Sequence, residues 1–219
     1  MKEIKLNIKQ SIRHNSHVLL LGAFCIALLL VRAKLTHSIF YFFLIWNLFL
    51  AFTPLAITSY LMERPYLIEK KWLFLPILCA WLLLLPNSPY IITDFMHLKR
   101  ETSVPVWFDV LLLISFSMAG LLFGLKSMKH IFYILAIRFN YIIVWLALFC
   151  VCILSGFGIY VGRYLRYNSW DILHRPLELI GEITNSLTTH PECITAWGVT
   201  FGFGTFLFLL FLMHPDIED

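Results

Sequence analysis

Six long apolar runs divide this sequence, and each is long enough to cross a lipid bilayer as a helix, which takes about 20 mostly apolar residues. They cover, approximately, residues 15–35, 38–62, 72–92, 106–125, 139–160 and 193–213. Hydrophobic residues make up 60% of the chain and charged residues 14%, whereas soluble domains are about a quarter charged. Most of the surface must therefore face lipid. We predict an all-α, polytopic membrane helix bundle that forms one integral-membrane domain over residues 1–219.

The first apolar run resembles the hydrophobic core of a signal peptide in length. Its fully apolar part covers residues 18–31, and Arg32 and Lys34 follow directly, without a small-residue cleavage pattern. We interpret it as an uncleaved first span whose polar ends reach the membrane interface.

A short amphipathic segment is expected between the fifth and sixth runs. Leu177, Ile180, Ile183 and Leu187 recur at three- and four-residue spacing, and Pro176 suits the first turn of a helix. We predict a helix over residues 176–187 that either lies on the membrane surface or covers the end of the bundle.

The lysines and arginines lie between the apolar runs and indicate the orientation. Alternate loops carry ten of them on the side of the amino terminus and seven on the other side. The positive-inside rule then places both termini in the cytoplasm. This distribution predicts the bilayer, including anionic lipid, as a partner, and no basic stripe suggests nucleic acid.

The five cysteines lie in or beside apolar runs, where we expect buried thiols that act as small hydrophobic side chains. Cys150 and Cys152 are two residues apart and so face different directions on a helix, which favours neither a redox pair nor a metal site.

Polar side chains that are costly inside a membrane gather at the ends of three spans. They are Asn87, Ser88, Tyr90, Asp94 and His97 at the end of the third, Asp109 at the start of the fourth, and Arg163, Arg166, Asn168 and Asp171 at the end of the fifth. Because successive spans alternate in direction, all three ends lie on one membrane face, the outer face by the charge count. We predict that they converge on one site.

The candidate catalytic residues are Asp94, His97 and Asp109. Asp94 and His97 are three residues apart and share a helix face. With Asp109 they could form a carboxylate–histidine–carboxylate cluster that holds a divalent metal or performs acid–base chemistry. The alternative is a solvated loop edge.

The candidate substrate-binding residues are the remaining members of this set. Pro86 and Pro89 break the third helix, and the carbonyls they free need partners that Asn87, Ser88 or a ligand could supply. Arg163 and Arg166 share a face and could bind a phosphate or carboxylate, or could instead reach lipid headgroups. Gly156, Gly158 and Gly162 favour close helix packing.

Three segments resemble a known family of uncharacterised bacterial membrane proteins, domain of unknown function 1361. They are residues 85–98 (LPNSPYIITDFMHL), 107–111 (WFDVL) and 158–171 (GIYVGRYLRYNSWD). The resemblance covers nearly the whole chain and implies a multi-pass protein of the bacterial inner membrane. It brings no activity and no assigned catalytic residues.

Two hypotheses about function remain open. In the first, the protein is an enzyme that acts at the outer leaflet on a lipid or lipid-linked substrate, with Arg163 and Arg166 as anion-binding residues. In the second, it is a non-catalytic scaffold or a small-solute transporter. The sequence shows no internal repeat that would favour transport and no known catalytic motif. The clustering of Asp, His and Arg on one face favours the first hypothesis.

Overall fold

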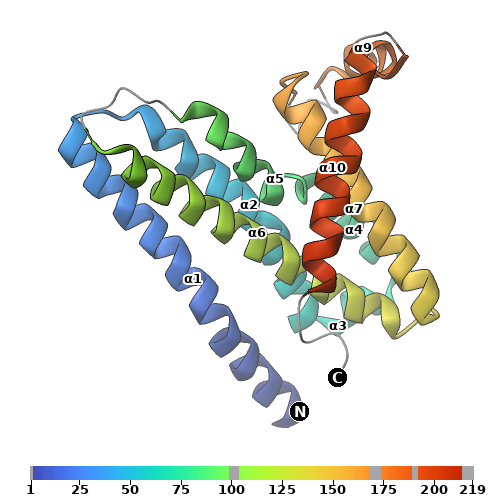
Figure 1. Ribbon diagram of the computed structural model, residues 1–219. Helices are drawn as coiled ribbons and strands as arrows, with labels where there is room; N and C mark the ends of the chain where they lie inside the picture. Colours follow the sequence, from blue (N-terminus) through green and yellow to red (C-terminus); the bar gives the residue numbers. More distant parts are fainter. Residues whose placement is uncertain (1, 99–103, 168–173, 189–191, 214–219) are drawn as a thin grey trace.

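The computed structural model of the protein describes residues 2–98, 104–167, 174–188 and 192–213 (Figure 1). Every regular element in these ranges is a helix, which confirms the predicted all-α class. The elements are α1 (Lys2–Thr36), η1 (Phe40–Phe42), α2 (Phe43–Glu63), α3 (Pro65–Glu69), α4 (Lys71–Leu84), α5 (Asn87–Tyr90), η2 (Ile91–His97), α6 (Val106–Ala136), α7 (Tyr141–Arg163), α9 (Pro176–Thr188) and α10 (Glu192–Leu212).

Five helical stretches of the described chain are long and apolar enough to cross a membrane. They are Phe40–Glu63, Lys71–His97, Val106–Ala136, Tyr141–Arg163 and Glu192–Leu212. The protein is therefore a multi-pass membrane protein, as its composition predicts. The sixth expected span falls in α1, which is not among these five, so its role as a span stays a prediction.

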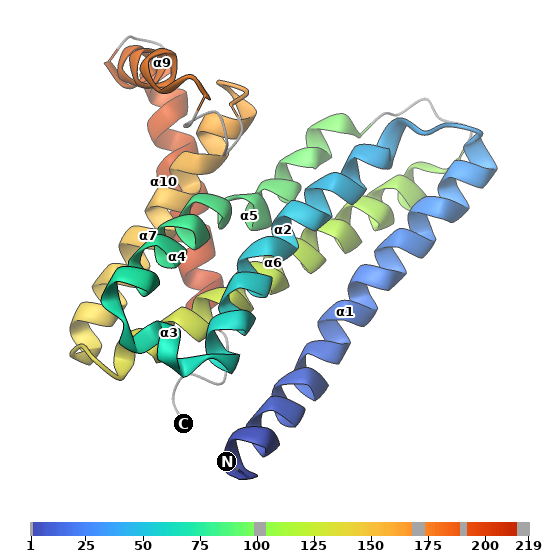
Figure 2. The same cartoon turned by 180° about the vertical axis from the view of Figure 1, so that it is seen from behind.

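Helix α6 is the central element of the bundle. Its most apolar stretch is 67% buried inside the protein, whereas the other four spans are at most 33% buried. Helices α1 and α2 pack along one part of α6, and α7 and α10 form a pair beside its other part (Figures 1 and 2). The remaining spans can therefore expose wide apolar faces to lipid.

Glycines allow the backbones of α7 and α10 to approach each other closely where the two helices cross. A Cβ atom on Gly156 would lie 2.2 Å from the carbonyl oxygen of Thr200, and one on Gly204 would lie 2.8 Å from the Cα atom of Ile153. Small residues let two backbones approach in this way. Gly158 packs similarly against Pro86, since a Cβ atom on Gly158 would lie 2.4 Å from the proline ring. The predicted packing role of Gly156 and Gly158 is therefore confirmed.

The fourth span is longer than predicted. We expected it to end near residue 125 and to be followed by a basic loop, but α6 continues to Ala136 and includes Lys126. The polar side chains of this extension have partners inside the protein. The Trp81 indole donates a hydrogen bond to Ser127 over 3.3 Å, and His130 lies 3.0 Å from the Thr58 hydroxyl. These contacts allow the helix to continue past its apolar part.

The two ends of the bundle differ in what they carry. The start of α1, the short helix α3 and the end of α10 lie at one end, while α9 lies at the opposite end (Figure 1). The end of α7 lies near α9, so the polar ends of the third and fifth spans are on the same side of the bundle as α9.

Candidate functional site

The proline break in the third span is stabilised by the side chains that the sequence places within it. Helix α4 ends at Leu84, and the Asn87 amide donates a 2.8 Å hydrogen bond to the Leu84 carbonyl. The Ser88 hydroxyl is fully buried and donates a 2.9 Å hydrogen bond to the Ala51 carbonyl of α2. Asn87 therefore supplies a partner to a carbonyl at the break, whereas Ser88 ties the break to α2.

The chain after the break continues as a 3-10 helix, which aligns the acidic and histidine side chains. In this helix residues three apart eclipse each other, so Asp94 and His97 project on one side of η2. Asp94 is only 1% exposed. Asn47 of α2 donates a 2.8 Å hydrogen bond to Asp94 Oδ2, and Arg163 Nη2 lies 3.5 Å from Asp94 Oδ1.

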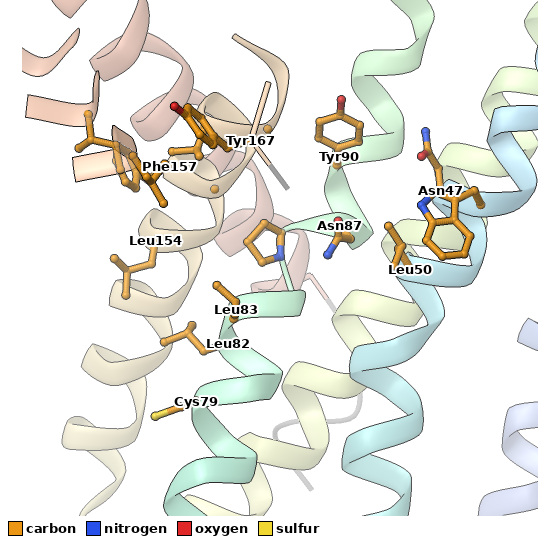
Figure 3. A pocket seen from close by; sticks show the side chains of 17 residues that line it. Asn47, Leu50, Cys79, Leu82, Leu83, Asn87, Tyr90, Leu154, Phe157 and Tyr167 are labelled. Atoms are coloured by element: carbon orange, nitrogen blue, oxygen red, sulfur yellow. The ribbon is translucent and has the colours of Figure 1, made fainter. Parts of the chain in front are cut away.

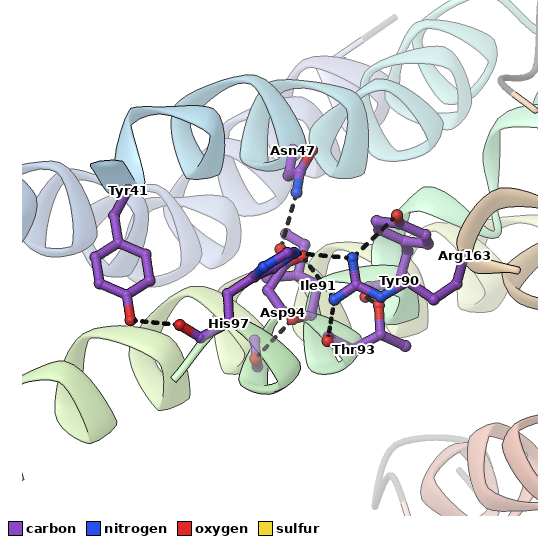
Figure 4. Close-up of polar contacts among 9 residues, drawn as sticks. Tyr41, Asn47, Tyr90, Ile91, Thr93, Asp94, His97 and Arg163 are labelled. Carbon is purple, nitrogen blue, oxygen red and sulfur yellow. Dashed lines mark hydrogen bonds and ion pairs between the residues drawn. The ribbon is translucent and has the colours of Figure 1, made fainter. Parts of the chain in front are cut away.

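Arg163, at the end of α7, joins the cluster from the fifth span (Figure 4). Its Nη1 atom lies 3.2 Å from His97 Nε2 and 3.4 Å from the Tyr90 hydroxyl, and its Nη2 atom donates to the carbonyl oxygen of Thr93. The guanidinium carbon lies 5.4 Å from the centroid of the Tyr90 ring. The predicted meeting of Arg163 with Asp94 and His97 is present in the structure.

The contact with Arg163 orients the His97 ring. A guanidinium group has only donors, so Nε2 of His97 is the acceptor when this 3.2 Å contact is a hydrogen bond. Phe43 packs against this ring with centroids 5.2 Å apart, and the Tyr41 hydroxyl donates a 3.1 Å hydrogen bond to the His97 carbonyl. His97 is thus held from both its ring and its backbone.

Asp109 pairs with Arg32, which the sequence places directly after the first apolar run. Arg32 of α1 donates to both Asp109 oxygens, over 2.6 Å and 3.1 Å, and both side chains are buried. The guanidinium also lies 4.3 Å from the centroid of the Tyr41 ring. A buried arginine requires a counter-charge, and Asp109 provides it.

The expected three-residue metal cluster does not form. Across the described ranges, no group of three or more His, Cys, Asp and Glu side chains is placed to hold a metal ion. Asp94 and His97 come together, but Arg163 lies between them and Asp109 is committed to Arg32.

The other predicted residues at the end of α7 are only partly described. Arg166 is exposed and adopts a left-handed backbone conformation, with φ 61°. Such a residue turns the chain sharply at a cost of about 1–2 kcal/mol, and Tyr167 folds back to donate a 3.2 Å backbone hydrogen bond to Val161. Asn168 and Asp171 lie outside the described residues.

An apolar cavity of about 420 Å³ lies beside this polar cluster (Figure 3). Its walls come from α2, α4, α5, α7 and α9, and most of its side chains are apolar. The polar side chains Asn47, Asn87, Tyr90 and Tyr167 lie along it, and Figure 3 places Tyr90 and Tyr167 at the end opposite Cys79. Asn47 and Tyr90 belong to both the cavity and the cluster.

The cavity opens on the outer surface of the bundle. Trp46 on α2 and Leu154 on α7 both line it and are 53% and 50% exposed, and Cys79 on α4 is exposed as well. The expectation of buried thiols therefore holds for Cys25 and Cys152 but not for Cys79 or for Cys150, which is also exposed. Because these helices are membrane spans, the opening faces lipid.

Helix α9 covers the end of the cavity near Tyr167. Its residues Leu179 and Ile183 line the cavity. Burial and the neighbouring carboxylate of Glu182, to which the phenol donates a hydrogen bond, raise the pKa of Tyr167 above its usual range. Tyr167 thus connects the end of α7 to α9.

Sequence reasoning missed Arg32, Tyr41, Asn47 and Tyr167 as members of these sites. Asn47 was the one with a usable signal, since an amide inside an apolar run needs a polar partner. Arg32 and Tyr41 are found only when the rotation of α1 and α2 about their axes is known.

These features define an all-helical, multi-pass membrane protein with a buried polar cluster beside an apolar cavity. The family model described as "Protein of unknown function (DUF1361)" matches residues 46–210, and the chain belongs to this family. The resemblance drawn from the sequence is thereby confirmed. No curated protein and no solved structure matches the chain.

Proposed function

We propose that this protein spans the bacterial plasma membrane six times, with α1 as the first span, both termini in the cytoplasm and α9 at the outer membrane surface. The positions of the start of α1 and the end of α10 at one end of the bundle support an even number of crossings (Figure 1). The excess of lysine and arginine on that side supports its cytoplasmic location.

Reporter fusions test this topology. Fusions after residues 66, 102, 138 and 180 are expected to report cytoplasm, outside, cytoplasm and outside in turn, because each follows one further span. A cytoplasmic signal at 102 would contradict the outer location of the polar cluster. Dual reporters, one active on each side of the membrane, provide the control at every position.

We propose further that the protein is an enzyme acting on the polar part of a lipid or lipid-linked substrate, at the cluster of Asp94, His97 and Arg163. Asp94 is a buried carboxylate whose Oδ1 atom accepts no hydrogen bond within the described structure. Nε2 of His97 faces Arg163, so it can accept a proton once a substrate displaces this contact. A carboxylate and an imidazole are the usual groups for acid–base catalysis.

The observation that carries this proposal is the shared wall between the cluster and a cavity that opens toward lipid. Asn47 and Tyr90 each touch a charged member of the cluster and also line the cavity. A substrate with a polar head and an apolar tail can therefore contact both at once. Arg166, Asn168 and Asp171 are proposed to contact the head from the end of α7.

The alternative functions fit this arrangement less well. A transporter of small solutes needs a polar path to water, whereas Leu179 and Ile183 of α9 cover the cavity with apolar side chains. A scaffold needs no cavity, and it would use the cluster only as an ion-pair network.

Replacing Asp94 with asparagine separates an enzyme from a scaffold. We expect the variant to insert and to keep its melting temperature in detergent, because Arg163 keeps its contacts with Tyr90, His97 and the Thr93 carbonyl. Activity should fall by about 10²–10⁴-fold, the usual contribution of an acid–base residue. The readout is complementation of a deletion strain, which the variant should fail to achieve.

Glu178→Gln is the control for this experiment, since it removes an exposed carboxylate of α9 and should complement fully. If Asp94→Asn lowers the melting temperature in step with the loss of complementation, the cluster is structural and the scaffold is the better explanation.

A further inference from the structure

We infer that the cavity between α2, α4 and α7 binds one hydrocarbon chain of a membrane lipid, which enters sideways from the bilayer and keeps its polar end beside Tyr90 and Tyr167. This inference rests on the proposed function and specifies the class of its substrate as a long-chain lipid held by one chain. Three features of the cavity lead to it.

The first feature is the direction of the opening. The exposed lining residues Trp46, Cys79 and Leu154 lie on three membrane spans, whereas the end nearest Tyr167 lies under the apolar side chains of α9. The opening of the cavity thus faces the hydrocarbon of the membrane, and α9 separates the other end of the cavity from water. A molecule dissolved in the membrane can enter without leaving it.

The second feature is the polarity gradient along the cavity. The end with Tyr90 and Tyr167 offers two hydroxyls, and the side of Asn47 adds an amide, while the far end at Cys79 is apolar (Figure 3). The eleven steps from Cys79 to Tyr90 span at most about 16 Å along the third span, at about 1.5 Å per residue of helix. This is about half the thickness of the hydrocarbon core, which is about 30 Å, and so matches one leaflet.

The third feature is size. Cavities of about 300–1,000 Å³ hold drug-sized ligands, and this one has about 420 Å³. A volume near the lower end of that range suits one chain. The second chain of a two-chain lipid would remain in the bilayer, which the sideways opening allows.

The charge of the cluster further restricts which lipid head groups the cavity can accept. Arg163 and Asp94 form an ion pair, so the polar end of the cavity carries no excess charge from these two groups. Recognition there depends on hydrogen bonds from the phenols and the amide. Asp94 Oδ1 lies in the ion pair with Arg163 but accepts no hydrogen bond within the described residues, so it can take a donor from the head. A head that carries a hydroxyl group meets both conditions.

Photo-cross-linking tests the inference with the full chain in nanodiscs. The probe is phosphatidylglycerol, whose head carries two hydroxyls, with a diazirine in the middle of one acyl chain. Labelling is mapped by mass spectrometry at Leu82, a half-buried cavity residue, and normalised to labelling at Leu209 on the exposed face of α10. We expect Cys79→Trp to lower the normalised labelling of Leu82 at least threefold by filling the cavity.

Cys150→Trp is the matched control, because Cys150 is equally an exposed cysteine of a span but does not line the cavity. It should leave the labelling unchanged. Leu154→Trp, on the opposite wall, is a second blocking variant in case Cys79→Trp does not fold. Labelling of Leu82 that neither blocking variant reduces would overturn the inference.

The outcomes for the chain-binding cavity and for the proposed enzyme can be told apart by including Asp94→Asn. If this variant fails to complement while the blocking variants leave labelling unchanged, the enzyme proposal stands and the cavity inference falls. If blocking reduces labelling but Asp94→Asn complements fully, the cavity binds a lipid chain and the enzyme proposal falls.

Discussion

The Asp109→Asn variant is expected to be among the least stable single variants of this protein. Asp109 is fully buried and neutralises Arg32, which is 3% exposed. Arg32 Nη1 already has no hydrogen-bond partner within the described residues, and the hydrogen bonds of the other two guanidinium nitrogens both go to Asp109. Removing one partner of a buried ion pair costs about 3–5 kcal/mol. Unfolding in detergent, followed by tryptophan fluorescence, measures this loss.

A double variant is the control for the buried pair. Arg32→Met combined with Asp109→Leu removes both charges and keeps apolar volume, so we expect most of the lost stability to return, as replacing a buried pair by apolar residues is often neutral or stabilising. If the double variant is as unstable as Asp109→Asn, the pair is not what holds α1 to α6. The contrast with Asp94→Asn is informative, because Arg163 also contacts Tyr90, His97 and the Thr93 carbonyl, whereas in the described part of the chain the Arg32 guanidinium donates to Asp109 alone.

Gly156→Leu is expected to separate α7 from α10. Even the Cβ atom would lie 2.2 Å from the Thr200 carbonyl oxygen and 2.8 Å from the Gly204 nitrogen, and both are backbone atoms that cannot move aside as a side chain would. Overpacking of a core costs about 1–3 kcal/mol and occasionally more, and this contact is of the more severe kind. Loss of the monodisperse peak in size-exclusion chromatography, or a lower melting temperature, reports the effect.

Gly202→Leu offers a matched control on the partner helix. A Cβ atom at Gly202 meets nothing within 4 Å, so the variant adds the same side chain within the membrane without a clash inside the chain. It should behave like the wild type. If Gly156→Leu and Gly202→Leu are equally stable, the close crossing of α7 and α10 is not required for folding.

The positions of the spans were predictable because the apolar runs are long and are bounded by charges. The break at Pro86 and the pairing of Asn87 with a freed carbonyl also followed from the sequence, since proline removes a backbone donor wherever it stands in a helix. The meeting of Asp94, His97 and Arg163 was predictable for a related reason: alternating spans bring the end of the third and the end of the fifth to one face.

The partner of Asp109 could not be predicted in the same way. Face assignment places Asp109 and the other polar ends on one side of the membrane, but the rotation of each helix about its axis decides which side chains touch. Here α1 turns Arg32 toward α6. The cavity was unpredictable for a similar reason, because its walls come from elements far apart in the sequence, including Pro86, Gly158 and the α9 residues Leu179 and Ile183. The extension of α6 beyond residue 125 depends on buried contacts with Trp81 and Thr58 that local composition does not reveal.

The ion pair between α1 and α6 has a consequence for how this family is divided and how it evolves. The family match begins at residue 46, so Arg32 lies upstream of it while Asp109 lies within it. A relative without Arg32 should also lack the aspartate, unless another element supplies a cation in place of Arg32. Positions 32 and 109 should therefore be inherited or lost together, and we expect the folding unit to begin earlier in the chain than the segment that the family model describes.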